Sequence, residues 1–170
     1  MVEMQSTLAN RARSHALTRP HPEVSSALWA GSFAGVFLLL ALAFLSISIY
    51  DESPWKLPRM IAATIRGPAA LEPAGEFDLV LVMLGVGVHF ALTLLYAFAL
   101  LGLIVDVKRW TAPYLGLAFG VALYFVNLYG FTQLFPWFAE LRTADTLAAH
   151  AVFGLLVARA YWAFTTHPSP

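Results

Sequence analysis

The sequence predicts an all-α membrane protein, a bundle of four transmembrane helices, and three observations lead to this prediction. Hydrophobic residues make up 59% of the 170 residues, charged residues make up 12%, and the mean hydropathy is +0.71. A soluble domain is about 45–50% apolar and about 25% charged. Four apolar segments each have the roughly 20 residues that a helix needs to cross a bilayer. They are 27–50, 77–105, 112–135 and 143–164.

The borders of these segments carry the signals of a membrane interface. All five tryptophans fall at or near a border: Trp29, Trp55, Trp110, Trp137 and Trp162. Indole rings prefer the headgroup layer because one edge is polar and the body is apolar. None of the segments shows the ten-residue alternation of a barrel strand. Residues 1–26 are polar and are expected to form a disordered tail, and 165–170 are expected to form a short C-terminal tail.

The connection between the first two spans is expected to hold a short amphipathic helix, about residues 54–66. Pro54 favours its start, and Gly67-Pro68 favours its end. The apolar face would carry Leu57, Met60, Ile61, Thr64 and Ile65, and the basic face would carry Lys56, Arg59, Ala63 and Arg66. This pattern is typical of a helix that lies in the interface with its basic side toward lipid phosphates. Two interpretations stay open, a structural collar for the bundle and a site for an anionic lipid or ligand.

Polar side chains within the spans form the candidate site. They are His89, Thr93 and Tyr96 in the second span, Tyr124 and Asn127 in the third, and His150 in the fourth. An ionisable group in a bilayer is costly, so it usually faces the bundle interior and has a partner. The spacing places His89, Thr93 and Tyr96 on one helix face and pairs Tyr124 with Asn127. As packing groups, His89 and Asn127 would belong to one network.

Three interpretations of these polar groups are open. In the first, they form hydrogen bonds between helices and fix the packing. In the second, they bind a ligand, either a b-type haem with His89 and His150 as axial ligands or a quinone. In the third, a homodimer moves a proton or a solute past a histidine.

Negative features of the sequence favour a non-catalytic function. The chain has no cysteine, which excludes disulfides and thiolate metal sites. Ten Lys and Arg residues balance ten Asp and Glu residues, so a nucleic acid is not an expected partner. No carboxylate lies in the middle of a span to orient a histidine for catalysis. The sequence therefore predicts an accessory or scaffold subunit without a metal or cofactor, surrounded by lipid.

Two glycine pairs with GxxxG spacing indicate close helix contacts. They are Gly31 with Gly35 and Gly116 with Gly120. Such pairs let two backbones approach closely, either within one chain or between chains. The expected partner is accordingly another membrane protein or a second copy of the chain.

Several stretches carry a resemblance. They are 54–63 with Gly67-Pro68, 88–90, 124–131 with 135–138, and Ala149-His150 with Phe153-Gly154. Over about residues 27–164 the chain resembles a group of small four-span bacterial inner-membrane proteins that are often labelled sodium:proline symporters. The resemblance implies a bacterial inner membrane and no particular activity. An even number of spans puts both termini on one side, and six Lys or Arg residues there against four opposite predict cytoplasmic termini.

Overall fold

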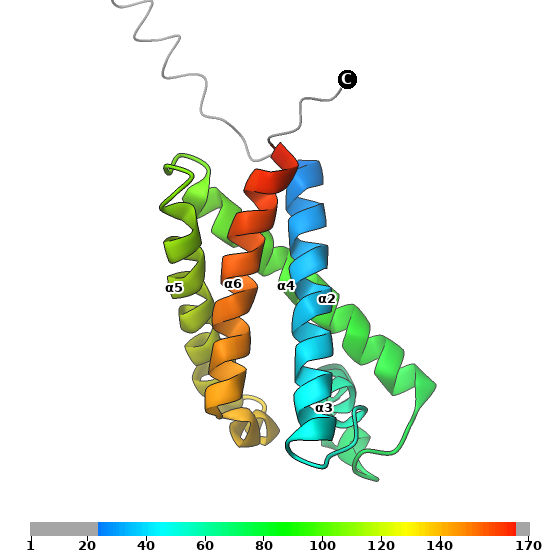
Figure 1. Cartoon of the computed structure of the whole chain (residues 1–170). Helices are drawn as coiled ribbons and strands as arrows, with labels where there is room; N and C mark the ends of the chain where they lie inside the picture. Colours follow the sequence, from blue (N-terminus) through cyan, green and yellow to red (C-terminus); the bar gives the residue numbers. More distant parts are fainter. Residues whose placement is uncertain (1–23, 166–170) are drawn as a thin grey trace, which may run out of the picture.

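The computed structural model describes residues 24–165, and within them the four predicted spans form one helical bundle (Figure 1). The spanning helices are α2 (Val24–Ser48), α4 (Leu79–Ile104), α5 (Ala112–Phe125) with its irregular continuation to Gln133, and α6 (Ala144–Thr165). All four are long and apolar enough to cross a membrane. No strand occurs in the described range, so the predicted all-α fold class is confirmed.

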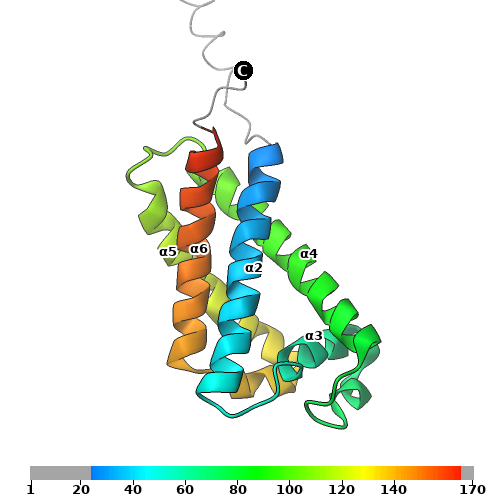
Figure 2. The ribbon, with the colours of Figure 1, turned by 45° about the vertical axis from the view of Figure 1, so that its right-hand side comes forward.

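Successive spans run in opposite directions through the bundle (Figure 1). Helix α6 lies between α5 and α2 and packs along both of them. Helix α4 packs on α2 but is inclined to the other three, and it diverges from α2 toward the end of the bundle where α3 lies (Figure 2). Contacts between α4 and α5 are sparse. The bundle is therefore tight on the α2, α5 and α6 side and loose between α4 and α5.

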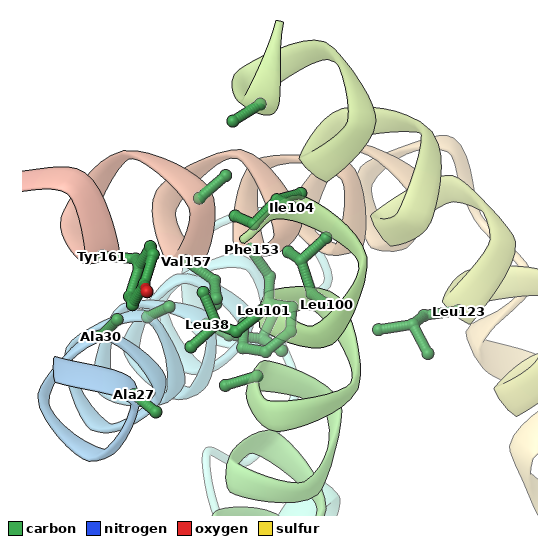
Figure 3. Close-up of a cluster of buried hydrophobic side chains, with 14 of the residues drawn as sticks. Ala27, Ala30, Leu38, Leu100, Leu101, Ile104, Leu123, Phe153, Val157 and Tyr161 are labelled. Atoms are coloured by element: carbon green, nitrogen blue, oxygen red, sulfur yellow. The ribbon is translucent and has the colours of Figure 1, made fainter. Parts of the chain in front are cut away.

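The half of the bundle near the described ends of the chain is solidly packed. Its core comes from the first half of α2, the last third of α4 and the middle and end of α6 (Figure 3). Ala27, Ala30 and Ala34 are fully buried, and these small side chains let α2 approach its neighbours. Larger residues fill the space that remains, chiefly Leu100, Leu101, Ile104, Phe153 and Val157.

The second glycine pair lies in the contact between α5 and α6. A Cβ atom at Gly116 would collide with the carbonyl oxygen of Gly154, and one at Gly120 would collide with the carbonyl oxygen of His150. Gly154 has the same relationship to Gly116 from the other side. The absence of side chains at these positions is what allows the two backbones to touch.

The first glycine pair lies in the contact between α2 and α4. A Cβ atom at Gly31 would lie 2.8 Å from the Cβ of Ala97, and one at Gly35 would lie 2.8 Å from Oγ1 of Thr93. Both GxxxG pairs therefore serve contacts within one chain. This decides between the two alternatives that the sequence left open, because neither pair is free for a second copy.

The first connection contains the expected helix as α3 (Lys56–Arg66), followed by η1 (Pro68–Leu71). Helix α3 packs against α4, where a Cβ at Gly85 would collide with the carbonyl oxygen of Pro58. Its faces differ in part from the predicted ones. Ala63, expected on the polar face, is buried, whereas Ile65, expected on the apolar face, is 62% exposed. The contact with α4 determines which residues of α3 are buried, and this contact cannot be predicted from helical periodicity alone.

The third span is not the uninterrupted helix expected over 112–135. Regular α-helix ends at Phe125 and is followed by a π-helical turn, η2 (Val126–Gly130), and two 3-10 segments, η3 (Phe131–Gln133) and η4 (Pro136–Leu141). The Arg142 side chain closes this end, because its Nε donates to the carbonyl of Leu128 at 2.7 Å and its Nη2 donates to Oγ1 of Thr132 at 2.7 Å.

The other borders agree with the sequence to within a few residues. Asp78 caps α4 by accepting a hydrogen bond from the Leu81 amide at 3.0 Å. Residues 24–26, which the sequence analysis placed in the polar tail, form the first turn of α2, and Thr165 ends α6. The remainder of the expected tails, 1–23 and 166–170, lies outside the described residues.

Candidate functional site

The half of the bundle near α3 contains a cavity of about 340 Å³ that is partly open to the surroundings. Every spanning helix contributes to its wall, together with α3 and the irregular segments that follow α5. Most of the wall is apolar. The polar side chains in it are Thr64, His89, Thr93, Tyr96, Asn127, Thr146 and His150, and no Asp, Glu, Lys or Arg lines it. Small-molecule sites usually have volumes of about 300–1,000 Å³ and this kind of lining.

The structure brings most of the sequence-predicted polar residues to this one cavity. His89, Thr93 and Tyr96 line it from α4, Asn127 lines it from η2, and His150 lines it from α6. Tyr124 does not line it. The Tyr124 ring packs edge-on against His150, with ring centroids 6.0 Å apart. Thr64 and Thr146 also line the cavity. The sequence placed Thr64 only on the apolar face of the interfacial helix and did not single out Thr146, because a threonine in or near a span usually bonds its own backbone.

A chain of hydrogen bonds joins three parts of the bundle across the cavity wall. The Tyr96 hydroxyl donates to Oδ1 of Asn127 at 2.7 Å, and Nδ2 of Asn127 lies 3.4 Å from Nε2 of His150. Nδ1 of His150 lies 2.8 Å from the carbonyl oxygen of Thr146. A carbonyl only accepts, so Nδ1 carries the proton in neutral His150 and Nε2 accepts from Asn127. In this chain each hydrogen bond is donated toward the next residue, from Tyr96 through Asn127 and His150 to the carbonyl of Thr146.

The π-helical turn positions the central member of this chain. Asn127 is the second residue of η2, at the point where the helical repeat widens. Single π turns within α-helices occur often at functional sites. No sequence signal marked this turn, because its segment is as apolar and as aromatic as the helix before it.

His89 belongs to a separate contact. Its Nε2 donates to the carbonyl oxygen of Gly35 on α2 at 2.9 Å, while Thr93 donates to the carbonyl of Phe90 in its own helix at 3.1 Å. The expectation that His89 shares a network with Asn127 is therefore wrong. Gly35 explains the difference, because the lack of a side chain there opens the α2 backbone to the imidazole.

The two histidines do not fit a haem with two axial imidazoles. Each axial histidine must offer one ring nitrogen to the iron, but three of the four ring nitrogens are hydrogen-bonded. His150 has the supporting bond from Nδ1 to a carbonyl that ligand histidines often have. Its Nε2, however, is hydrogen-bonded to Asn127, so His150 has no ring nitrogen free for iron. His89 has only Nδ1 free. No cluster of three or more potential metal ligands occurs in residues 24–165.

The predicted basic face of α3 is largely engaged by the protein itself. Arg59 is 4% exposed and donates to the backbone carbonyls of Glu76 at 3.0 Å and Glu72 at 2.8 Å, so it holds the connection to α4. Lys56 is paired with two carboxylates. Arg66 alone of the three basic residues is exposed. The expectation of a common basic surface toward lipid is wrong for Arg59, and these contacts favour the interpretation of α3 as a structural collar.

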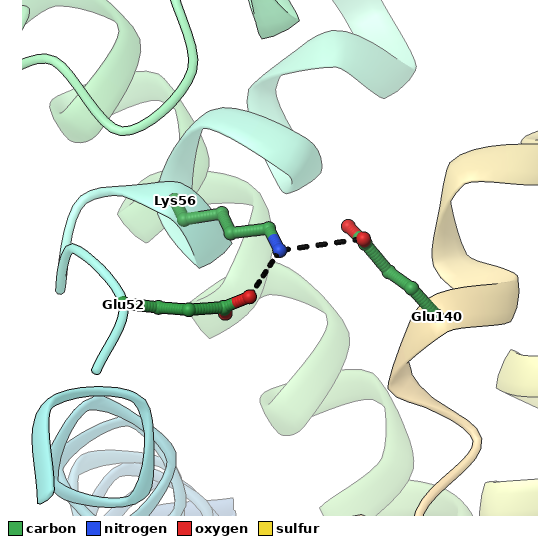
Figure 4. Close-up of polar contacts among 3 residues, drawn as sticks. All are labelled: Glu52, Lys56 and Glu140. Atoms are coloured by element: carbon green, nitrogen blue, oxygen red, sulfur yellow. Dashed lines mark hydrogen bonds and ion pairs between the residues drawn. The ribbon is translucent and has the colours of Figure 1, made fainter. Parts of the chain in front are cut away.

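Lys56 ties the first connection to the end of the third span. Its Nζ lies 2.7 Å from Oε1 of Glu52 and 3.3 Å from Oε2 of Glu140 (Figure 4). Partial burial lowers the pKa of Lys56, but the hydrogen bonds to the two carboxylates outweigh burial and raise that pKa above its ordinary value.

A smaller hollow of about 100 Å³ lies beside these ion pairs, and Glu52, Lys56 and Glu140 line it. It shares Leu42, Leu57, Leu141 and Thr146 with the main cavity.

Four apolar helices around a partly polar interior define a multi-pass α-helical membrane protein. Comparison with protein-family models, with curated proteins and with solved structures gives no match for this chain. The residues and contacts of the chain itself therefore carry the functional proposal below.

Proposed function

We propose that this protein is a non-catalytic accessory subunit of the bacterial inner membrane that holds one lipid-soluble small molecule within its bundle. The observation that carries the proposal is the cavity of about 340 Å³ between the spans. Packed protein interiors contain few voids larger than a water molecule. A space of this size, with polar side chains from α3, α4, η2 and α6 in its lining, favours a site for a ligand.

The position of the cavity favours a ligand that enters from the lipid. Val88 and Leu92 of α4 and Leu123 of α5 form part of its wall. These two helices contact each other sparsely, and both carry exposed apolar side chains such as Leu95 and Leu115. The gap between them is the place where a hydrophobic molecule would pass at the least cost in broken contacts.

The chemistry of the wall favours binding without catalysis. A general acid or base acts with a partner that tunes its protonation, usually a carboxylate beside a histidine. No carboxylate lines this cavity, and the ring nitrogens of His150 are both held in hydrogen bonds. The groups present are suited to recognising the polar end of an otherwise apolar molecule.

An accessory role implies a second membrane protein or a second copy, which would contact the lipid-facing surface. Neither glycine pair is free for this purpose, so the partner would pack on larger side chains such as those of Leu40, Phe44 and Leu95. The proposal includes cytoplasmic termini, for which the support is the distribution of Lys and Arg between the two sides.

A solute or proton pathway is the second candidate function, and one observation favours it. The smaller hollow adjoins the main cavity and extends it toward Tyr50 and Lys56 at the α3 end of the bundle. Toward the other end, the buried side chains of Leu100, Leu101 and Ile104 pack the core. The cavity therefore continues toward one end of the bundle only, which fits retention of a molecule better than passage.

The proposal is tested by filling the cavity. The protein is extracted directly from membranes into lipid nanodiscs, and bound small molecules are identified by mass spectrometry. Leu92→Trp places a large ring into the cavity, and Leu95→Trp makes the same change on the lipid-facing side of α4, where Leu95 is 60% exposed.

We expect a molecule that copurifies with the wild-type protein and with Leu95→Trp but is lost from Leu92→Trp. The same small molecules in all three preparations would show that the cavity holds none of them, and the proposal would fail. Mass spectrometry of the intact complexes also reports whether a second protein accompanies the chain, as an accessory role requires.

A further inference from the structure

We infer that the ligand of this cavity is an uncharged aromatic molecule with a hydroxyl group, of the hydroquinone type, whose O–H donates to Nδ1 of His89. The inference rests on the proposed function, because it assumes that the cavity holds a ligand. It concerns the chemical class of that ligand, which the hydrogen-bond directions in the wall restrict.

The protonation of His89 is set by its contact with α2. The carbonyl oxygen of Gly35 accepts at 2.9 Å, so Nε2 must carry the hydrogen. In the neutral ring Nδ1 then has a lone pair. Nδ1 makes no hydrogen bond with any described residue, although His89 is only 7% exposed and lines the cavity. An acceptor that is neither hydrated nor paired with a donor is costly, so a bound molecule that offers a hydrogen there is favoured.

Three hydroxyl groups of the wall already donate their hydrogens to other groups. The hydroxyls of Thr64 and Thr93 donate to carbonyls of their own helices, at 2.7 and 3.1 Å, and the Tyr96 hydroxyl donates to Asn127. Their oxygens remain acceptors. The Asn127 amide keeps one hydrogen beyond the one directed at His150. The wall thus offers acceptors in excess, and a ligand with a hydroxyl fits it better than one with carbonyls alone.

The remaining lining restricts the charge and shape of the ligand. No Asp, Glu, Lys or Arg faces the cavity, so a charged head group would be buried without a counter-ion. The apolar wall is rich in aromatic rings: Phe131, Phe135, Phe138 and Phe153, besides Tyr96. Aromatic rings favour stacked or edge-to-face contact with another ring. An aromatic head group is therefore preferred to an aliphatic alcohol.

The test uses a series of compounds with one decyl chain and different head groups. The series is a hydroquinone, its monomethyl ether, its dimethyl ether, the corresponding quinone, and decanoate as the charged member. The two ethers separate the effect of the hydroxyl from redox chemistry, because neither is readily oxidised to a quinone. Dissociation constants are measured by titration calorimetry on the protein in nanodiscs, against empty nanodiscs.

We expect the hydroquinone and its monomethyl ether to bind about tenfold or more tightly than the dimethyl ether and the quinone, since one buried acceptor left unpaired has an effect of this order. His89→Phe removes the acceptor and should bring these ratios close to one. Tyr124→Phe is the matched control, because Tyr124 is a buried residue that does not line the cavity, and it should leave the ratios unchanged.

The outcomes separate the inference from the proposed function. Equal binding of all four uncharged compounds, blocked by Leu92→Trp, would overturn the hydroxyl requirement and keep the ligand site. Tightest binding of decanoate would overturn the inference of an uncharged ligand. No binding of any compound to the wild-type protein would count against both. The ligand series on the wild-type protein decides the question even where His89→Phe fails to fold.

Discussion

The Tyr96 hydroxyl on α4 donates a 2.7 Å hydrogen bond to Oδ1 of Asn127 in the π-helical turn of the third span. Among the hydrogen bonds of the described residues, it is the one side-chain bond that joins α4 to the third span. The two elements otherwise contact each other sparsely. This bond and the adjoining contact with His150 therefore hold the loosest wall of the bundle together.

The first prediction concerns this bond. Tyr96→Phe and Asn127→Leu should each destabilise the protein by about 0.6–2 kcal/mol, the range for hydrogen bonds between membrane helices. The double variant should lose less than the sum, because residues that share one network are coupled. Reversible unfolding in mixed micelles measures all three. As a control, Tyr96→Phe combined with Thr111→Val, at the opposite end of α4 and α5, should give additive losses.

The second prediction concerns the contact between α5 and α6. Gly120→Ala should destabilise the bundle by about 1–3 kcal/mol or more, because the new Cβ meets a backbone carbonyl that cannot move aside. Gly87→Ala is the matched control, since nothing lies within 4 Å of a Cβ there. Alanine favours a helix over glycine, so this control should be neutral or stabilising by up to about 1 kcal/mol. Equal losses in both variants would contradict the close contact.

The third prediction is a pH dependence that comes from Lys56. The pKa of Lys56 in the folded protein is raised above its ordinary value of 10.5. A raised folded pKa means that the stabilising contribution is present below pH 10.5 and is lost as pH rises through the folded value. The wild-type protein should therefore lose stability above about pH 10.5. Because Lys56 is only partly buried and solvent screens its ion pairs, the loss should be no more than about 1 kcal/mol.

Lys56→Met should lack this part of the alkaline loss. Denaturation midpoints of both proteins from pH 8 to 12 provide the measurement. Lys108→Met is the control, because Lys108 lies exposed at the other end of the bundle. Identical alkaline curves for the wild-type protein and Lys56→Met would show that Glu52 and Glu140 do not hold the ammonium in solution.

The fourth prediction concerns the membrane topology. The chain has no cysteine, so single-cysteine variants report one position each. Leu40→Cys and Leu95→Cys, which lie within spans and face outward, should resist a membrane-impermeant maleimide. Lys108→Cys should react from the cytoplasmic side and Ala69→Cys from the other side. Reaction of Leu40→Cys and Leu95→Cys as freely as of the connection variants would contradict the four-span arrangement.

The class of fold was accessible from the sequence because it depends on local quantities. Span length, apolar composition and the tryptophans at the span borders each reflect the free energy of transferring one segment from water to lipid. This free energy is a sum over the residues of that segment, so it can be judged from the sequence. The four spans and α3 were predicted on this basis and are present. The polar residues of the spans were also identifiable, because a polar group in lipid has to find a partner wherever the neighbouring helices lie.

The pairing of those residues was decided by the tertiary structure alone. His89 bonds Gly35, and Asn127 bonds Tyr96, because the π-helical turn and the inclination of α4 set the distances between spans. For the same reason Arg59 is buried by the connection to α4, although the sequence placed it on the polar face of its helix, and both glycine pairs are used in contacts within the chain. These pairings and this burial depend on contacts between segments far apart in the chain, and they cannot be predicted from the periodicity within one segment.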